Sequence, residues 1–181
     1  MVEELARQAE ALPIGLPWLD TSEVGPVVSA RQFERVLGYI ESGTAEGARL
    51  VTGGGRPRDP VLERGFFIAP TVFDDVGPAM RIAREEIFGP VMSVMAWDDD
   101  EAMLALANGV EYGLTAAIVT NDLARAMETA ERVEAGYVWI NGSGRYLGAP
   151  YGGWKQSGLG REECFDELLS YTQVKNVNLR W

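Results

Sequence analysis

The residues whose types are best suited to binding or catalysis lie at positions 84–91. Two adjacent carboxylates there precede an aromatic side chain and a Gly-Pro pair. Glu85 and Glu86 supply the carboxylates, and Phe88 supplies the ring. An ionised carboxylate accepts strong hydrogen bonds from O–H and N–H donors, so the run could hold a polar ligand. It could equally be two solvated charges beside a short helix, because single carboxylate pairs are common and rarely functional.

A second distinctive segment is the glycine-rich stretch at residues 142–160. Gly152 and Gly153 allow backbone conformations that are closed to other residues, and Pro150 stiffens the approach to them. On these features alone the segment is a tight connection. Loops of this kind also carry function when a rigid scaffold holds them.

Some chemistry is excluded by what the chain lacks. It contains no histidine, and Cys164 is its single cysteine. A Ser/His or Cys/His nucleophile pair, an imidazole base and a His-based zinc site are therefore impossible within these residues. We expect Cys164 on the apolar side of a helix with Leu168, as a small buried hydrophobe rather than a nucleophile. We predict no catalytic residue and no metal site.

Net charge and hydropathy argue against some classes of binding partner. Sixteen basic against 27 acidic residues give a net charge of −11, which disfavours nucleic acid and anionic membrane surfaces. The longest apolar stretches, such as residues 115–119, fall far below the roughly 18 residues of a membrane helix. The N-terminus lacks the basic region and apolar core of a signal peptide, so a cytoplasmic location is expected.

The elements that must position these residues alternate regularly. Helical periodicity covers residues 2–12, and Ser29 with Gln32 forms a capping-box signature for a helix that Gly43 should end. Asp98 and Asn121 are predicted to cap two later helices. Strands are predicted at residues 49–52, 71–73, 91–97, 115–119 and 137–141.

This alternation implies right-handed crossovers and a mostly parallel sheet covered on both faces. The expected fold is α/β, a three-layer α/β/α arrangement forming a single domain over residues 1–181. A terminal extended segment is expected at residues 173–181.

Ordered motifs resemble a known family. The runs at residues 84–91 and 150–158 are similar to segments in the C-terminal part of the NAD(P)-dependent aldehyde dehydrogenases. Further matches follow in the family's order at residues 25–29, 65–72, 112–116, 139–141 and 158–162. The resemblance covers nearly the whole chain, which makes it far more specific than a single glycine motif.

The resemblance implies roles for individual residues. Glu86 would accept hydrogen bonds from the nicotinamide ribose of NAD or NADP, and Phe88 would pack beside the nicotinamide ring. The loop before the Pro-aromatic-Gly-Gly turn lines the aldehyde entrance in the family. It would make substrate-side residues of Arg145, Tyr146, Leu147 and Tyr151, the last of which stands where phenylalanine is commoner.

The family places its nucleophile, general base, oxyanion amide and nearly all of its dinucleotide-binding domain N-terminal to the matched region. The chain is therefore expected to be the C-terminal portion of an enzyme that oxidises aldehydes to carboxylic acids, inactive alone and unable to hold NAD or NADP by itself. It would be a truncated gene product or one half of a split enzyme, completed by an N-terminal polypeptide.

An alternative is a non-catalytic module for oligomerisation or partner binding. In the family, the strand corresponding to residues 174–181 pairs across a subunit boundary, and an exposed strand edge offers backbone donors and acceptors to a partner. A homo-oligomer formed through this strand is the implied assembly.

Overall fold

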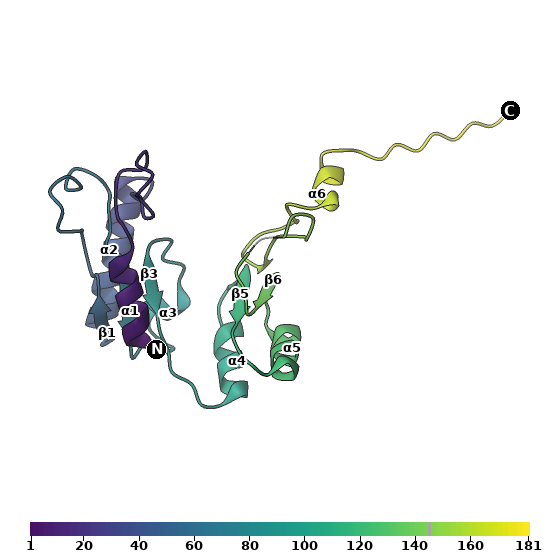
Figure 1. The fold of residues 1–181 in the computed structure, drawn as a ribbon. Helices are drawn as coiled ribbons and strands as arrows, with labels where there is room; N and C mark the ends of the chain where they lie inside the picture. The colour runs from purple at the N-terminus through teal and green to yellow at the C-terminus, as the bar shows by residue number, and fades with distance from the viewer. Residues whose placement is uncertain (145) are drawn as a thin grey trace. The chain divides into compact units, whose positions relative to one another are not determined.

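The computed structural model describes residues 1–144 and 146–181 and divides the chain into two compact units, Met1–Trp97 and Asp98–Trp181 (Figure 1). The expectation of a single domain over residues 1–181 stays a prediction. Within the described ranges, no helix has the length and apolar character needed to cross a membrane.

The first unit is a three-stranded sheet with helices. The strands follow the order β1-β2-β3, with β1 antiparallel and β3 parallel to β2. The elements are α1 (Val2–Ala11), α2 (Ala30–Ala45), β1 (Arg49–Thr52), β2 (Thr71–Asp74), α3 (Arg81–Arg84) and β3 (Val91–Ser93).

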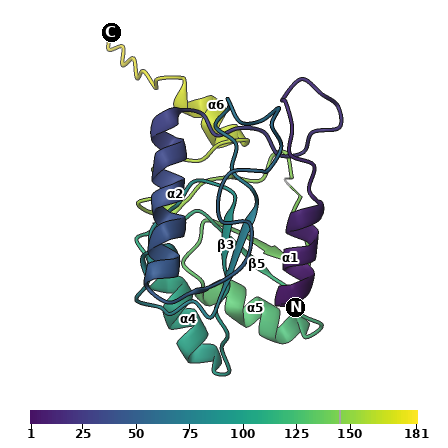
Figure 2. The same cartoon turned by 90° about the vertical axis from the view of Figure 1, so that its left-hand side faces the viewer.

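Helices α1 and α2 cover opposite faces of this sheet (Figure 2). Successive residues of a strand point to opposite faces. Phe73 of β2 is fully buried in a core with Val36 and Ile40 of α2. Its neighbour Val72 lines an apolar pocket together with Leu5 of α1. The main core of the unit therefore lies between α2 and the sheet.

The start of α2 is as predicted and its end is not. The Ser29 side chain caps the helix by accepting a hydrogen bond from the Gln32 amide. Gly43 was expected to stop the helix, but α2 continues to Ala45, and Gly47 follows in the left-handed region with φ of 99°. Gly43 is buried instead, so its small size serves packing.

The second unit contains two small sheets. Strands β5 and β6 pair in parallel, whereas β4 and β7 pair antiparallel. The elements are α4 (Asp100–Asn108), β4 (Tyr112–Gly113), β5 (Thr115–Ile118), α5 (Leu123–Arg132), β6 (Tyr137–Ile140), β7 (Trp154–Lys155) and α6 (Phe165–Ser170). Residues 173–181 extend beyond α6 without helix or strand (Figure 1).

The mixed α/β class is confirmed, and the described residues form small sheets with no clear three-layer arrangement around a mostly parallel sheet. Their strands divide among three sheets, and two of the four pairings are antiparallel. The alternation of helices and strands along the chain does not specify which strands pair. The pairings depend on contacts between distant residues that a local pattern does not contain.

Three local predictions were displaced by a residue or more. Asp99 rather than Asp98 caps α4, and Asp122 rather than Asn121 caps α5, because each accepts the hydrogen bond that the helix start offers. Cys164 is the residue before α6, where it is half-buried rather than packed on an apolar face of the helix.

Gly43 offers a test of the core against α2. A Cβ at this position would lie 2.8 Å from Ile82 Cδ1 and 3.3 Å from Phe73 Cζ. Overpacking of this kind costs about 1–3 kcal/mol, which exceeds the gain of about 1 kcal/mol from replacing a helical glycine. We expect Gly43→Ala to lower the free energy of unfolding by about 1 kcal/mol, measured by urea titration.

Gly38→Ala is the matched control, because Gly38 lies in the same helix and a Cβ added there would meet nothing within 4 Å. It should raise the free energy of unfolding by about 0.5–1 kcal/mol. Equal effects of the two substitutions would show that Gly43 has no special packing role.

Candidate functional site

The segment between α3 and β3 presents its side chains alternately inward and outward. The Glu85 carboxylate binds Tyr39 of α2, and Ile87 is buried in the core. Glu86 and Phe88 are exposed, Phe88 to 73%. The two residues assigned to the cofactor by resemblance therefore point away from the core of their own unit.

Phe88 is held in an unusual backbone conformation. Its φ is 57°, in the left-handed region that bulky side chains rarely adopt. Such a conformation costs of order 1–3 kcal/mol and persists where the surroundings over-determine it. The Gln32 side-chain amide donates to the carbonyl oxygens of Ile87 at 3.0 Å and Phe88 at 2.9 Å. A Cβ on Gly89 would lie 2.6 Å from Val36 Cγ2, so the segment lies directly against α2.

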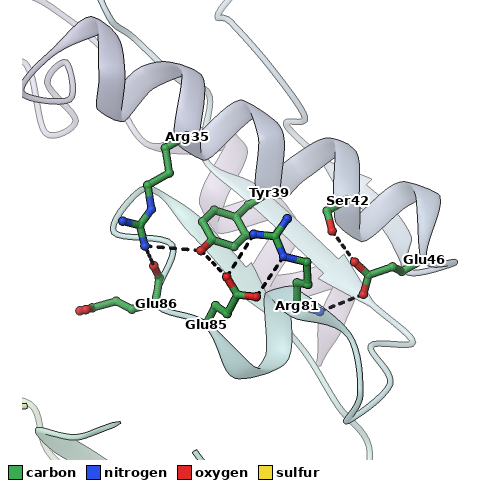
Figure 3. A network of polar contacts seen from close by, with 7 residues as sticks. All are labelled: Arg35, Tyr39, Ser42, Glu46, Arg81, Glu85 and Glu86. Atoms are coloured by element: carbon green, nitrogen blue, oxygen red, sulfur yellow. Dashed lines mark hydrogen bonds and ion pairs between the residues drawn. The ribbon is translucent and has the colours of Figure 1, made fainter. Parts of the chain in front are cut away.

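Glu85 is the fixed carboxylate of the pair. Its oxygens accept hydrogen bonds from Arg81 Nε at 2.9 Å, Arg81 Nη2 at 3.1 Å and the Tyr39 hydroxyl at 2.7 Å (Figure 3). The Arg81 guanidinium first, and then the Tyr39 hydroxyl, lower the pKa of Glu85 to about 2. Glu85 is therefore a permanently ionised structural group at neutral pH.

Glu86 is held by its backbone and not by its carboxylate. Arg35 Nη2 donates to the Glu86 carbonyl oxygen at 2.8 Å and lies 3.4 Å from the Tyr39 hydroxyl oxygen. Figure 3 shows the Glu86 carboxylate pointing away from this network. Two adjacent glutamates thus have different environments, and the second one presents its acceptor oxygens outward.

A hollow of about 360 Å³ borders this segment. Glu85, Glu86 and Phe88 all line it, together with Ser93 and Met95. A carboxylate beside an exposed aromatic ring combines hydrogen-bond acceptors with a flat apolar surface. That combination suits a ligand that carries both hydroxyl groups and a planar ring.

The predicted substrate-side residues lie in the second unit, apart from Arg145, which is outside the described residues. Tyr146 and Leu147 are 71% and 92% exposed. The Tyr146 amide donates to the Tyr137 hydroxyl at 3.4 Å, and the Tyr137 and Tyr151 rings have centroids 5.6 Å apart. Tyr137 of β6 therefore contacts both Tyr146 and Tyr151, a role that the sequence did not indicate.

Sequence reasoning also missed the function of Gln32 and the importance of Arg35. Gln32 was assigned to a capping box, but its side chain binds the carbonyls of residues 87 and 88. The available signal was the spacing of polar residues along α2, which places Gln32, Arg35 and Tyr39 on one side of the helix.

The acidic run at residues 98–101 caps α4 and forms ion pairs with arginines of α5. Asp99 caps α4 through the Ala102 amide at 2.7 Å. Asp100 pairs with Arg125, and Glu101 pairs with Arg132 at 2.5 Å. Across the part of the chain that the structure describes, no group of His, Cys, Asp and Glu side chains could hold a metal ion.

Residues 1–177 match the model of the aldehyde dehydrogenase family. The chain belongs to this family. It is 50% identical to aldehyde dehydrogenase tropH of Talaromyces stipitatus over 185 residues, covering 98% of this chain and 36% of that protein. It is 45% identical to the betaine aldehyde dehydrogenase of Brucella melitensis, covering 97% and 36% respectively.

Solved aldehyde dehydrogenase structures are also similar to this chain. The Mycobacterium tuberculosis enzyme complexed with NAD⁺ gives a TM-score of 0.89 at 42% identity, covering 95% of this chain and 35% of that one. The Bacillus cereus NAD⁺ complex gives 0.88 at 43% identity, covering 96% and 35%. The chain thus spans about a third of the length of these aldehyde dehydrogenases, and the residue roles assigned above by resemblance stay predictions.

The contacts of Glu85 with Arg81 and Tyr39 predict how the free energy of unfolding depends on pH. The pKa of Glu85 is about 2 in the folded chain against an ordinary value of 4.5, so the unfolded state takes up the proton first as pH falls. Its stabilising contribution is complete above about pH 4.5 and is lost toward about pH 2. We expect the free energy of unfolding of the native chain to fall more steeply across this window than that of Glu85→Gln.

Urea titrations at several pH values measure the difference. Its size is modest, because the Glu85 side chain is 45% exposed and water screens the pair. Glu63→Gln, which changes an exposed carboxylate elsewhere in the unit, should keep the steep dependence of the native chain. Parallel curves for the native chain and Glu85→Gln would show that the Arg81 and Tyr39 contacts do not stabilise the ionised form.

Proposed function

We propose that residues 1–181 are the C-terminal portion of the catalytic domain of an NAD(P)-dependent aldehyde dehydrogenase, which converts aldehydes to carboxylic acids. The nucleophile, general base and most of the dinucleotide site are supplied by another segment or polypeptide, and the chain alone is inactive. The observation that carries this proposal is the pairing of an outward carboxylate with an exposed aromatic ring at one hollow, in a chain 50% identical to an aldehyde dehydrogenase.

The residues at this hollow fit the nicotinamide end of NAD or NADP. Glu86 accepts hydrogen bonds from the ribose hydroxyls, and the Phe88 ring packs beside the nicotinamide. When bound, the cofactor accepts the hydride released by aldehyde oxidation. The chain's own contribution is to fix the orientation of that end of the cofactor. Without a site for the rest of the dinucleotide, it does not retain the cofactor alone.

The second unit contributes the aldehyde entrance. Tyr146, Leu147 and Tyr151 line it, and the large exposed surfaces of Tyr146 and Leu147 support this role. The hydroxyl of Tyr151 adds a polar group to the entrance. The three-layer arrangement around one mostly parallel sheet belongs to the same proposal, as the form reached in the completed enzyme.

Activity assays test the proposal. The purified 181-residue chain should produce no aldehyde-dependent NADH, because its single cysteine, Cys164, lies outside the segment in which the family places its nucleophile. Joining it to the N-terminal portion of the tropH relative should restore NADH formation. In that joined enzyme, Glu86→Gln should lower kcat/KM for NAD about tenfold to a hundredfold, since a hydrogen bond to a charged group contributes about 1.5–3 kcal/mol.

Glu63→Gln is the matched control, and it should leave kcat/KM for NAD unchanged. NADH formation by the 181-residue chain alone would refute the proposed inactivity. An active joined enzyme that is insensitive to Glu86→Gln would remove Glu86 from the cofactor site.

The C-terminal segment supports a second role in assembly. Its apolar side chains are strongly exposed, with Val177 at 79%, Leu179 at 74% and Trp181 at 105% of their reference areas. Exposed apolar side chains on extended backbone favour strand addition to a partner sheet. We propose that this segment pairs with a second copy of the chain or with the complementing N-terminal polypeptide. A non-catalytic oligomerisation module is the alternative function that this observation favours.

Light scattering after size exclusion tests the role of the segment. Val177→Asp with Leu179→Asp should shift the chain from oligomer to monomer, because each change removes apolar surface and adds a charge. Asn176→Asp with Asn178→Asp adds the same charge at polar positions and should retain the oligomer. A native chain that is strictly monomeric, alone and with the N-terminal portion, would contradict this assembly role.

A further inference from the structure

Helix α2 carries a polar stripe that follows the segment before β3. The stripe consists of Gln32, Arg35, Tyr39, Ser42 and Glu46, the last being the C-cap of the helix. Successive members are three or four residues apart, a spacing that places them on one side of a helix. Figure 3 shows four of them, from Arg35 to Glu46, aligned along α2 above residues 81–86.

The stripe contacts residues 81–88 in antiparallel order. At its C-terminal end, Glu46 accepts a hydrogen bond from the Arg81 backbone amide at 2.8 Å, and Ser42 donates to the same Glu46 carboxylate. In the middle, Tyr39 binds the Glu85 carboxylate. The stripe thus fixes both ends of the short helix α3.

The N-terminal end of the stripe holds the backbone of the segment that follows. Arg35 binds the carbonyl oxygen of Glu86, and Gln32 binds those of Ile87 and Phe88. Three consecutive carbonyl groups are therefore fixed by two side chains of one helix. A segment held in this way takes its geometry from the helix, and Phe88 is kept in its left-handed conformation.

Glu85 links the two halves of the stripe. The Tyr39 ring lies beneath two guanidinium groups, with Arg81 Cζ at 4.8 Å and Arg35 Cζ at 5.5 Å from its centroid. Its hydroxyl donates to Glu85, whose other contacts come from Arg81. This carboxylate already accepts three hydrogen bonds from protein donors, so it is less available to a ligand than the Glu86 carboxylate.

We propose that the polar stripe of α2 positions Glu86 and Phe88 for the cofactor, and that Glu85 and Tyr39 are positioning residues acting through this segment. The inference rests on the proposed function, because it takes Glu86 as the ribose acceptor. Preorganised side chains lower the ordering cost of binding and fix the geometry at the reacting ring. Removing a positioning residue should therefore affect cofactor use through Glu86 and not independently of it.

The first experiment uses the 181-residue chain and needs no cofactor. Chymotrypsin cleaves after exposed aromatic residues, and mass spectrometry can quantify cleavage of the Phe88–Gly89 bond. Tyr39→Phe and Glu85→Gln should accelerate this cleavage severalfold, because the segment opens more often once its anchor is lost. Glu34→Gln, an exposed change in α2 outside the stripe, should not. Unchanged cleavage in both Tyr39→Phe and Glu85→Gln would overturn the proposal.

The second experiment is a double-mutant cycle in the joined enzyme. Glu85→Gln alone and Tyr39→Phe alone should each lower kcat/KM for NAD about threefold to tenfold, with Glu34→Gln unchanged. In the Glu86→Gln background, Glu85→Gln should add little, because the charged acceptor that Glu85 positions is gone. Effects that simply multiply would show that Glu85 acts on stability and not through Glu86, and would overturn the proposal.

The two hypotheses fail in different ways. An inactive joined enzyme, or one insensitive to Glu86→Gln, counts against the proposed function, while the cleavage experiment still decides whether the stripe holds the segment. An enzyme that is sensitive to Glu86→Gln but insensitive to Glu85→Gln and Tyr39→Phe counts against the positioning role alone.

Discussion

The contact between α2 and the segment that precedes β3 is the constraint on which the first unit depends. One side of α2 buries Val36 and Ile40 in the core against Phe73, so the helix cannot shift without breaking that packing. Another side binds the backbone of residues 86–88. The position of the segment is consequently fixed by the position of α2, although residues 86–88 form no helix or strand. Core packing, and not local propensity, gives this exposed segment its defined geometry.

The adjacent carboxylates Glu85 and Glu86 show how one local constraint separates two chemically identical groups. Extended backbone directs neighbouring side chains to opposite sides, so only one of the pair can reach α2. Glu85 faces Tyr39 and Arg81, which donate hydrogen bonds to its carboxylate and stabilise its charged form. The Glu86 carboxylate points away from these contacts, and both glutamates border the hollow.

Sequence patterns predicted the features that depend on near neighbours. The Ser29 cap follows from local spacing and agrees with the structure. The family motif singled out Glu86, which is exposed at the hollow, and its role toward the cofactor stays a prediction. Gly43 and Gln32 were misassigned because their partners are distant in sequence. The Gln32 side chain binds a carbonyl 55 residues away, and Gly43 is small because Ile82 packs against it. The pairing of strands into three sheets was missed for the same reason.

The groups described in this chain are better suited to binding than to bond-making chemistry. Glu85, with a pKa of about 2 and three hydrogen-bond donors around it, is too weak a base to take a proton at neutral pH. Cys164 is half-buried before α6, and no histidine exists in the sequence to generate its thiolate. Glu86 and Phe88 instead offer an acceptor and an apolar ring in a fixed arrangement. Such a surface can orient a reacting partner, and under the proposed function another segment or polypeptide supplies the nucleophile.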